Sequence, residues 1–142
     1  MKVVINNTYG GFSLSKENFK RYCEIKDIEC WIEEDKEFTG LGLFTVWTVS
    51  PEERMETVED DSYYKMSKEL REEYNKLYES QTLTSYDIKR NDPALVQMVE
   101  EEPGQFGKFS NLKIVEIPDD VEWTIEEYDG NEWVAEVHRC WS

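Results

Sequence analysis

The chain has one histidine, His138, so any acid–base chemistry that depends on histidine would rest on this residue. In a strand, His138 shares a face with Glu136 and Cys140, because side chains two residues apart point the same way. That spacing on one strand rarely aligns a cysteine nucleophile with its histidine base. The pattern favours a hydrogen-bonded strand histidine, with His138 kept as the one catalytic candidate.

A glycine-containing turn lies between the first predicted strand and the first predicted helix, from Asn6 to Ser13. Backbone N–H groups in such a turn, together with the positive end of the helix dipole, can hold a phosphate or carboxylate. The turn has neither a Gly-x-Gly-x-x-Gly pattern nor the Gly-Lys-Ser/Thr ending of phosphate-binding loops. The alternative is a tight turn that needs glycine for its backbone conformation and packs Tyr9 and Phe12 into the core.

Two arginines could assist an anion site at this turn. Arg90 could contact a phosphate or carboxylate through two hydrogen bonds, or it could brace a helix start by pairing with Asp92. Arg139 falls on a predicted strand face with Trp133 and Val137 that looks buried, so it should pair with a carboxylate, stack on tryptophan or line a pocket. The candidate ligand-binding residues are Asn6, Tyr9, Gly10, Gly11, Phe12, Arg90 and Arg139.

The three cysteines, Cys23, Cys30 and Cys140, form no Cys-x-x-Cys pair, and with one histidine no zinc spacing is present. We therefore predict no metal and no cofactor. An odd number of cysteines and an N-terminal apolar run of three residues favour reduced thiols and a cytoplasmic location. No apolar run approaches the length of a membrane span.

The net charge of −16 opposes direct binding to nucleic acid and to anionic membranes. The charge is concentrated, because residues 116–132 contain eight acidic and no basic residues. Such a segment could bind a basic surface on a partner protein, although solubility is the simpler interpretation. The candidate protein-binding residues are Glu116, Asp119, Asp120, Glu126, Glu127 and Asp129.

Periodicity predicts a strand over 2–6, a helix from an N-cap at Ser15 to Lys26, a strand over 41–49 and a helix from 61 or 62 to 79. Residues 31–37 stand out only as charged. Asp92 and Pro93 predict the start of a short helix, and residues 105–111 are predicted as a loop.

The C-terminal third is predicted to be β-structure. Strands are expected over 112–117, 121–128 and 132–141, with a hairpin turn at Asp129 and Gly130. These elements predict an α+β fold with a mainly antiparallel sheet and two or three helices packed on one face. With no linker or repeat in the sequence, residues 1–142 are predicted to form a single domain.

Four segments together resemble a family of small bacteriophage and prophage proteins of unassigned function. The segments are Lys2–Asn6 with Tyr9–Phe12 and Leu14–Ser15, Arg90–Val96, Leu112–Trp123, and Glu127–Glu136 followed by His138 and Arg139. The family has no agreed activity, so the resemblance transfers no catalytic residue. It implies a phage gene that acts in host takeover or in antagonism of host defence.

The expected function is therefore a non-enzymatic binding protein in phage–host conflict. Its partner would be a host protein or a small anionic, nucleotide-like signal. The alternatives are a nucleotide-directed hydrolase or transferase that uses His138, and an accessory structural protein, with self-association left open.

Overall fold

The computed structural model describes residues 1–34, 43–107 and 110–137. It groups the chain into two compact units, Met1–Lys26 with Ser85–Ser142, and Asp27–Thr84. The α+β class and the antiparallel pairing are confirmed, and the described strands are divided among three small sheets. The single domain over residues 1–142 stays a prediction.

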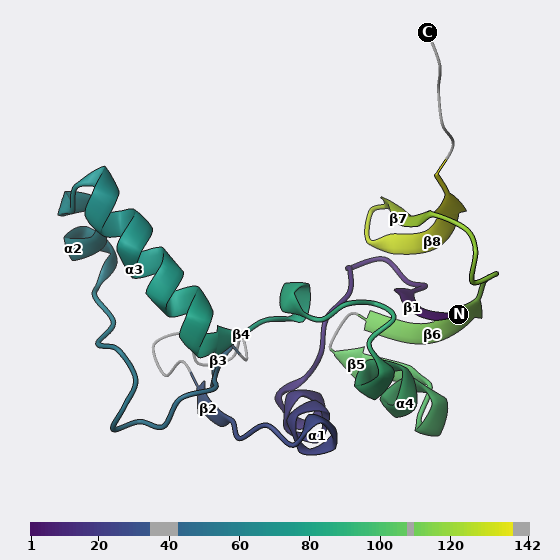
Figure 1. Ribbon diagram of the computed structural model, residues 1–142, viewed down its shortest axis with the longest axis horizontal. Helices are drawn as coiled ribbons and strands as arrows, with labels where there is room; N and C mark the ends of the chain where they lie inside the picture. The colour runs from purple at the N-terminus through teal and green to yellow at the C-terminus, as the bar shows by residue number, and fades with distance from the viewer. Residues whose placement is uncertain (35–42, 108–109, 138–142) are drawn as a thin grey trace, which may run out of the picture. The chain divides into compact units, whose positions relative to one another are not determined.

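A three-stranded sheet forms the centre of the first unit (Figure 1). Strand β6 (Ser110–Glu116) lies between β1 (Lys2–Asn6) and β5 (Gly104–Gly107), and both pairs are antiparallel. All of β1 after Lys2 is buried, which explains its continuous apolar run without alternation. The loop predicted over 105–111 is wrong at both ends, because residues 105–107 belong to β5 and residues 110 and 111 to β6, and each strand supplies the other's pairing partner.

Two helices cover this sheet. Helix α4 (Pro93–Glu101) contacts β1 and β6 through its buried face, and α1 (Lys16–Lys26) packs against α4. The predicted caps are confirmed, since the Asn18 N–H donates to Ser15 Oγ and the N–H groups of Ala94 and Leu95 donate to Asp92 Oδ1. A short 3-10 helix, η1 (Ser85–Asp87), precedes this segment.

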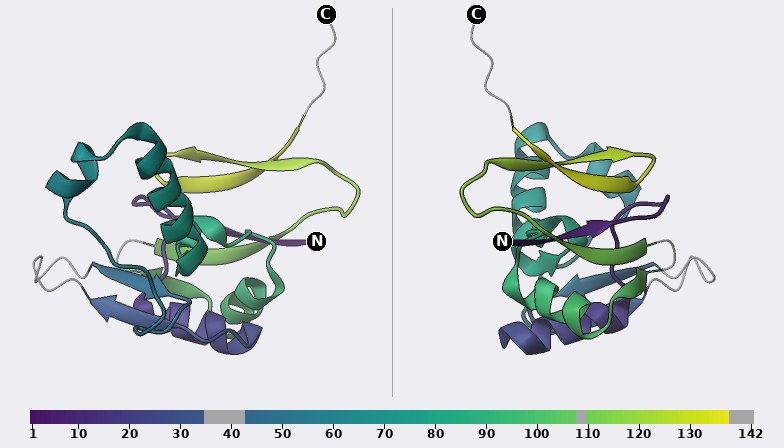
Figure 2. Two further views of the ribbon diagram at one scale, coloured as in Figure 1. Left: turned by 60° about the vertical axis from the view of Figure 1, so that its left-hand side comes forward. Right: turned by 90° about the vertical axis from the view of Figure 1, so that its right-hand side faces the viewer.

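The β7–β8 hairpin completes the first unit. Strands β7 (Trp123–Tyr128) and β8 (Asn131–Glu136) pair with each other, and Asp129 and Gly130 form the predicted two-residue turn, with φ of 49° and 87°. The hairpin and helix α4 lie on opposite sides of β1 (Figures 1 and 2), and β8 is the strand that contacts β1. Residue 137 is the last C-terminal residue described, so the predicted strand over 132–141 is observed only in part.

The second unit contains a sheet in the order β2 (Trp31–Glu34), β3 (Phe44–Trp47), β4 (Thr82–Leu83). Strand β2 was missed in the charged stretch, because its strand character comes from pairing with β3, where Trp31 lies opposite Trp47. Strand β3 is shorter than the predicted 41–49, of which residues 41 and 42 lie outside the described residues.

The helix predicted over 61–79 is two helices, α2 (Asp60–Lys65) and α3 (Lys68–Gln81). Met66 and Ser67 between them have extended backbone. The Ser67 side chain accepts a hydrogen bond from the Leu70 N–H, so Ser67 starts a second helix as its N-cap. Apolar periodicity continues across the break, which is why the sequence pattern did not reveal it.

Asp92 supports a pH-dependent link between α1 and α4. Its carboxylate accepts hydrogen bonds from the Tyr22 hydroxyl at 2.9 Å and from Lys26 Nζ at 2.6 Å. Burial alone would raise the pKa of Asp92, but the bonds from Lys26, Tyr22 and the Ala94 N–H outweigh it and hold the pKa below the usual 3.8. A carboxylate with a lowered pKa stabilises the fold above the pKa of the unfolded state, and this contribution is lost as the pH falls.

We expect Asp92→Asn to lower the free energy of unfolding near neutral pH, because asparagine keeps the helix cap but removes the charge that pairs with Lys26. The deficit should shrink as the pH falls below about 3.8, where the unfolded wild-type chain takes up a proton, and vanish below the lowered pKa of Asp92 in the folded state. Urea denaturation across this pH range measures it, with the exposed Asp120→Asn as control. A deficit that stays constant with pH would contradict the charge-based explanation.

Candidate functional site

Asn6, at the end of β1, is fully buried and joins three parts of the first unit. Its side-chain Nδ2 donates to the carbonyl oxygens of Thr8 and Gly130, both at 2.8 Å. Its Oδ1 accepts from the Asn111 N–H at 2.8 Å. Both amide hydrogens are therefore used within the protein, which makes Asn6 a connection between strand, turn and hairpin.

The glycine-containing turn packs against the hairpin turn. The Gly10 N–H donates to the Asp129 carbonyl oxygen at 3.3 Å. A Cβ atom placed on Gly130 would lie 2.7 Å from the Gly10 nitrogen, and closer still to the Gly11 nitrogen. The backbone of Gly10 and Gly11 therefore faces the β7–β8 turn, and the Gly10 N–H is already bonded to it.

Arg90 forms a paired, largely buried contact with Glu132. Its Nη1 and Nη2 atoms donate to the two Glu132 carboxylate oxygens at 2.6 and 2.8 Å. The guanidinium group lies over the Phe12 ring, 3.7 Å from its centre. The Glu132 carboxylate also accepts from the Asn6 N–H at 2.8 Å, and the Val4 N–H donates to the Arg90 carbonyl oxygen.

These contacts cover the edge of β1 that does not pair with β6. The side-chain carboxylate of Glu132 and the backbone of Arg90 satisfy two N–H groups that would otherwise be open at that edge. The expected Arg90–Asp92 pairing is not the one observed, since Asp92 bonds to Tyr22 and Lys26 instead. This arrangement favours a structural role for the turn and Arg90.

The remaining predicted ligand residues take no part in the Arg90–Glu132 pair, apart from Phe12 beneath the guanidinium group. Tyr9 is 62% exposed, so it does not pack into the core as the alternative interpretation proposed. Phe12 is half-buried beneath Arg90. His138, Arg139 and Cys140 lie outside the described residues. Over the described ranges, no group of three or more His, Cys, Asp or Glu side chains could hold a metal ion.

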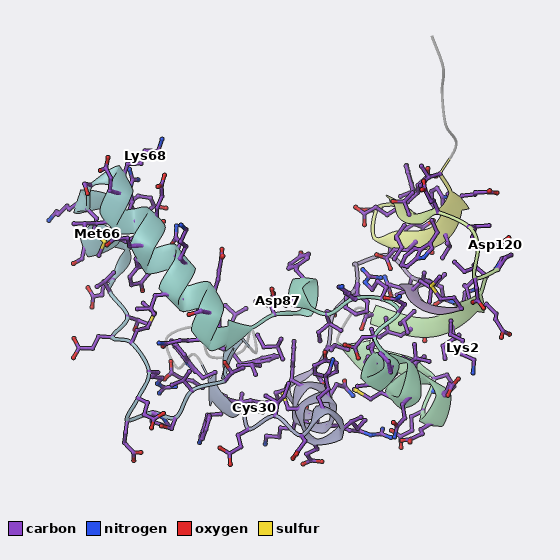
Figure 3. The ribbon with its side chains drawn as sticks, in the orientation of Figure 1. Lys2, Cys30, Met66, Lys68, Asp87 and Asp120 are labelled. Carbon is purple, nitrogen blue, oxygen red and sulfur yellow. The ribbon has the colours of Figure 1, made fainter. Side chains whose placement is uncertain are left out.

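The predicted acidic residues follow the chain from the end of β6 through the β6–β7 turn and along both faces of the hairpin. The acidic hairpin surface, as we name it, consists of Glu116, Asp119, Asp120, Glu122, Glu126, Glu127 and Asp129, all of them exposed. Asp119 also bonds to the N-terminal amino group at 2.5 Å. Asp120, labelled in Figure 3, lies in the turn before β7.

The face assignment predicted for the last strand is wrong. Trp133 is 43% exposed and Val137 is also exposed, whereas Glu132 on the opposite face is 7% exposed. The acidic neighbour faces inward because Arg90 neutralises it. Trp133 instead joins the acidic hairpin surface, and its Nε1 donates to Glu126 across the strand pair at 3.1 Å.

Sequence reasoning missed Glu132 and Asn111 as parts of this bonded cluster. The residue that neutralises Arg90 lies 42 positions away, and the residue that bonds to Asn6 lies 105 positions away. No local spacing carries such a signal.

We found no protein-family model, no curated protein and no solved structure that matches this chain. Among the helices of the described residues, none combines the length and apolar character needed to cross a membrane.

Proposed function

We propose that this chain is a non-enzymatic binding protein of phage origin that antagonises a host defence system by binding a host protein. The binding surface is the acidic hairpin surface together with Trp133. The partner presents a basic surface, such as the groove of a nucleic-acid-binding protein. The phage context rests on the sequence resemblance, and the binding mode rests on the placement of charge.

The observation that carries this proposal is the exposure of seven carboxylates in a stretch without a basic residue. The eighth acidic residue of that stretch, Glu132, is buried and paired with Arg90, so the segment separates a structural charge from seven exposed ones. Carboxylates concentrated on one hairpin make the local electrostatic potential more negative, and this speeds association with a basic partner.

A small anionic ligand is less well supported than a protein partner. Arg90 is already neutralised by Glu132, and the Gly10 amide is bonded to the hairpin turn. A phosphate at this position would have to displace a carboxylate that makes two charge-assisted hydrogen bonds. These occupied contacts therefore favour a host protein over a small anion as the partner.

We expect the protein to co-elute with a host protein on a sizing column at low salt. The complex should dissociate in about 0.5 M salt, where charges are screened over a few ångströms. A triple variant, Glu126→Gln, Glu127→Gln and Asp129→Asn, should abolish co-elution. Asparagine suits the left-handed backbone at position 129, so the turn is kept.

A matched variant separates the surface from the total charge. Glu72→Gln, Glu73→Gln and Glu79→Gln on α3 remove the same three charges from exposed positions of the second unit. This variant should still co-elute with the host protein. Equal behaviour of the two variants, or turnover of a nucleotide panel by purified wild-type protein, would count against the proposal.

A further inference from the structure

Among the strands of the described residues, none pairs with the outer edge of β7. In the described part of the chain, the hairpin forms a sheet of two strands, and β7 pairs with β8 alone. In an antiparallel pair, residues alternate between positions whose N–H and C=O groups bond to the partner strand and positions whose groups point away from it.

The register of the hairpin identifies the β7 residues whose N–H and C=O groups point away from β8. Tyr128 and Asn131 flank the two-residue turn, and Glu126 pairs with Trp133. Just before β7, Glu122 is also in a bonded position, since its carbonyl oxygen accepts from the Val137 N–H at 2.9 Å. Positions 122, 124, 126 and 128 therefore bond to β8, so the N–H and C=O groups of Ile125 and Glu127 point to the open edge.

Strand β8 is the hairpin strand that lies against β1, and its Glu132 side chain bonds to the Asn6 N–H. Glu132 and the backbone of Arg90 thus cover the free edge of β1, whereas no strand of the described residues pairs with the outer edge of β7. Such an edge is a template for pairing with an added chain.

The side chains beside this edge define which chain would fit. Glu126 and Tyr128 lie on the same face as Trp133, and Tyr128 is 72% exposed. Glu127 is exposed on the opposite face. Carboxylates along the edge repel a second copy of this acidic strand and attract a basic one. The exposed Trp133 and Tyr128 rings can accept arginine or lysine by cation–π contact.

We propose that an extended, arginine- or lysine-rich segment of the partner adds to β7 as a third strand of the hairpin sheet. This inference rests on the proposed function and specifies how the acidic hairpin surface is used. Backbone hydrogen bonds to Ile125 and Glu127 give the alignment. Alternate basic side chains then meet Glu126 and the aromatic rings, which gives the selectivity.

The test measures fluorescence anisotropy with a labelled peptide, Arg-Thr-Arg-Thr-Arg-Thr, which matches the six residues of β7. A second peptide has the same side chains but a methyl group on every backbone nitrogen, so its backbone cannot donate hydrogen bonds. We expect the methylated peptide to bind at least about tenfold more weakly, because the backbone bonds to the edge are lost.

Three variants locate the binding. Glu127→Pro removes an N–H that points outward and no bond to β8, so the hairpin should fold while affinity falls about tenfold. Glu127→Gln, which removes only the charge, should lower affinity about threefold. Asp120→Asn removes one charge from the turn before β7, and its effect should be smaller than that of Glu127→Gln.

Strand addition is overturned if wild-type protein binds both peptides equally, or if it binds neither in low salt. The methylated peptide keeps the test valid even if Glu127→Pro does not fold. Equal binding of both peptides, together with co-elution of a host protein that the hairpin triple variant abolishes, would leave the proposed function standing. If neither the peptide nor a host protein binds, the proposed function is overturned together with strand addition.

Discussion

Replacing Glu132 with alanine should lower the free energy of unfolding by about 3–5 kcal/mol, the usual cost of removing one partner from a buried ion pair. Glu132 has a side chain that is 5% exposed, and it is bonded at once to Arg90 and to the Asn6 N–H. The alanine variant leaves the Arg90 guanidinium without its carboxylate and a buried N–H without an acceptor. Urea denaturation measures the loss.

A matched control is Glu102→Ala. Glu102 pairs with Arg21 in the same unit, but its side chain is 80% exposed, so its removal should change the stability by no more than about 0.5 kcal/mol. The double variant Arg90→Leu with Glu132→Leu should lose less stability than Arg90→Leu and Glu132→Leu lose together when each is made alone, by about 1 kcal/mol or more. A Glu132→Ala loss as small as that of Glu102→Ala would contradict the paired arrangement.

Much of the fold could be predicted because its signals are local. The strand at Lys2–Asn6, the caps at Ser15 and Asp92, and the turn at Asp129 each depend on residues within a few positions of one another. Backbone conformation, capping and apolar periodicity act over that range. The α+β class followed from these elements and is confirmed.

The elements that sequence reasoning missed depend on distant partners. Strands β2 and β5 exist because β3 and β6 pair with them, and neither stretch shows strand periodicity by itself. The break before α3 had a local signal, since Ser67 is a good N-cap, but continuous apolar spacing concealed it. Long-range pairing, more than propensity, explains these differences.

The candidate site shows the same division. The exposure of the acidic residues followed from their density in the sequence. The pairing of Arg90 with Glu132 could not be predicted in this way. Neighbouring residues of a strand face opposite sides, and the apolar pattern placed Trp133, and not Glu132, on the inward side. A buried ion pair reversed the face that hydrophobicity alone would choose.

Replacing Gly130 with alanine should cost about 3 kcal/mol or more, the second large effect that we expect, since strain and steric overlap each cost about 1–3 kcal/mol. Gly130 has a φ of 87°, where a side chain is strained. Its added Cβ would also meet backbone atoms, 2.7 Å from the Gly10 nitrogen and 2.9 Å from the Gly11 Cα. Backbone atoms cannot rotate away as a flexible side chain can, so the glycine-containing turn must shift.

Gly11→Ala separates these two causes. Gly11 has a similar φ of 92°, but a Cβ there would meet no atom within 4 Å, so this variant carries the strain without the overlap. It should cost about 1–2 kcal/mol, the usual penalty for a left-handed residue with a side chain. The difference between the two variants, measured by urea denaturation, reports the packing of the two turns.

Amide exchange locates the effect within the molecule. In Gly130→Ala, the Asn111 N–H should exchange faster, because Asn6 holds both this N–H and the Gly130 carbonyl. Equal losses for the two variants would mean that the turns do not pack together in solution. The Gly10 and Gly11 amides would then be open to an anion, and phosphate titration would decide between that site and the acidic hairpin surface.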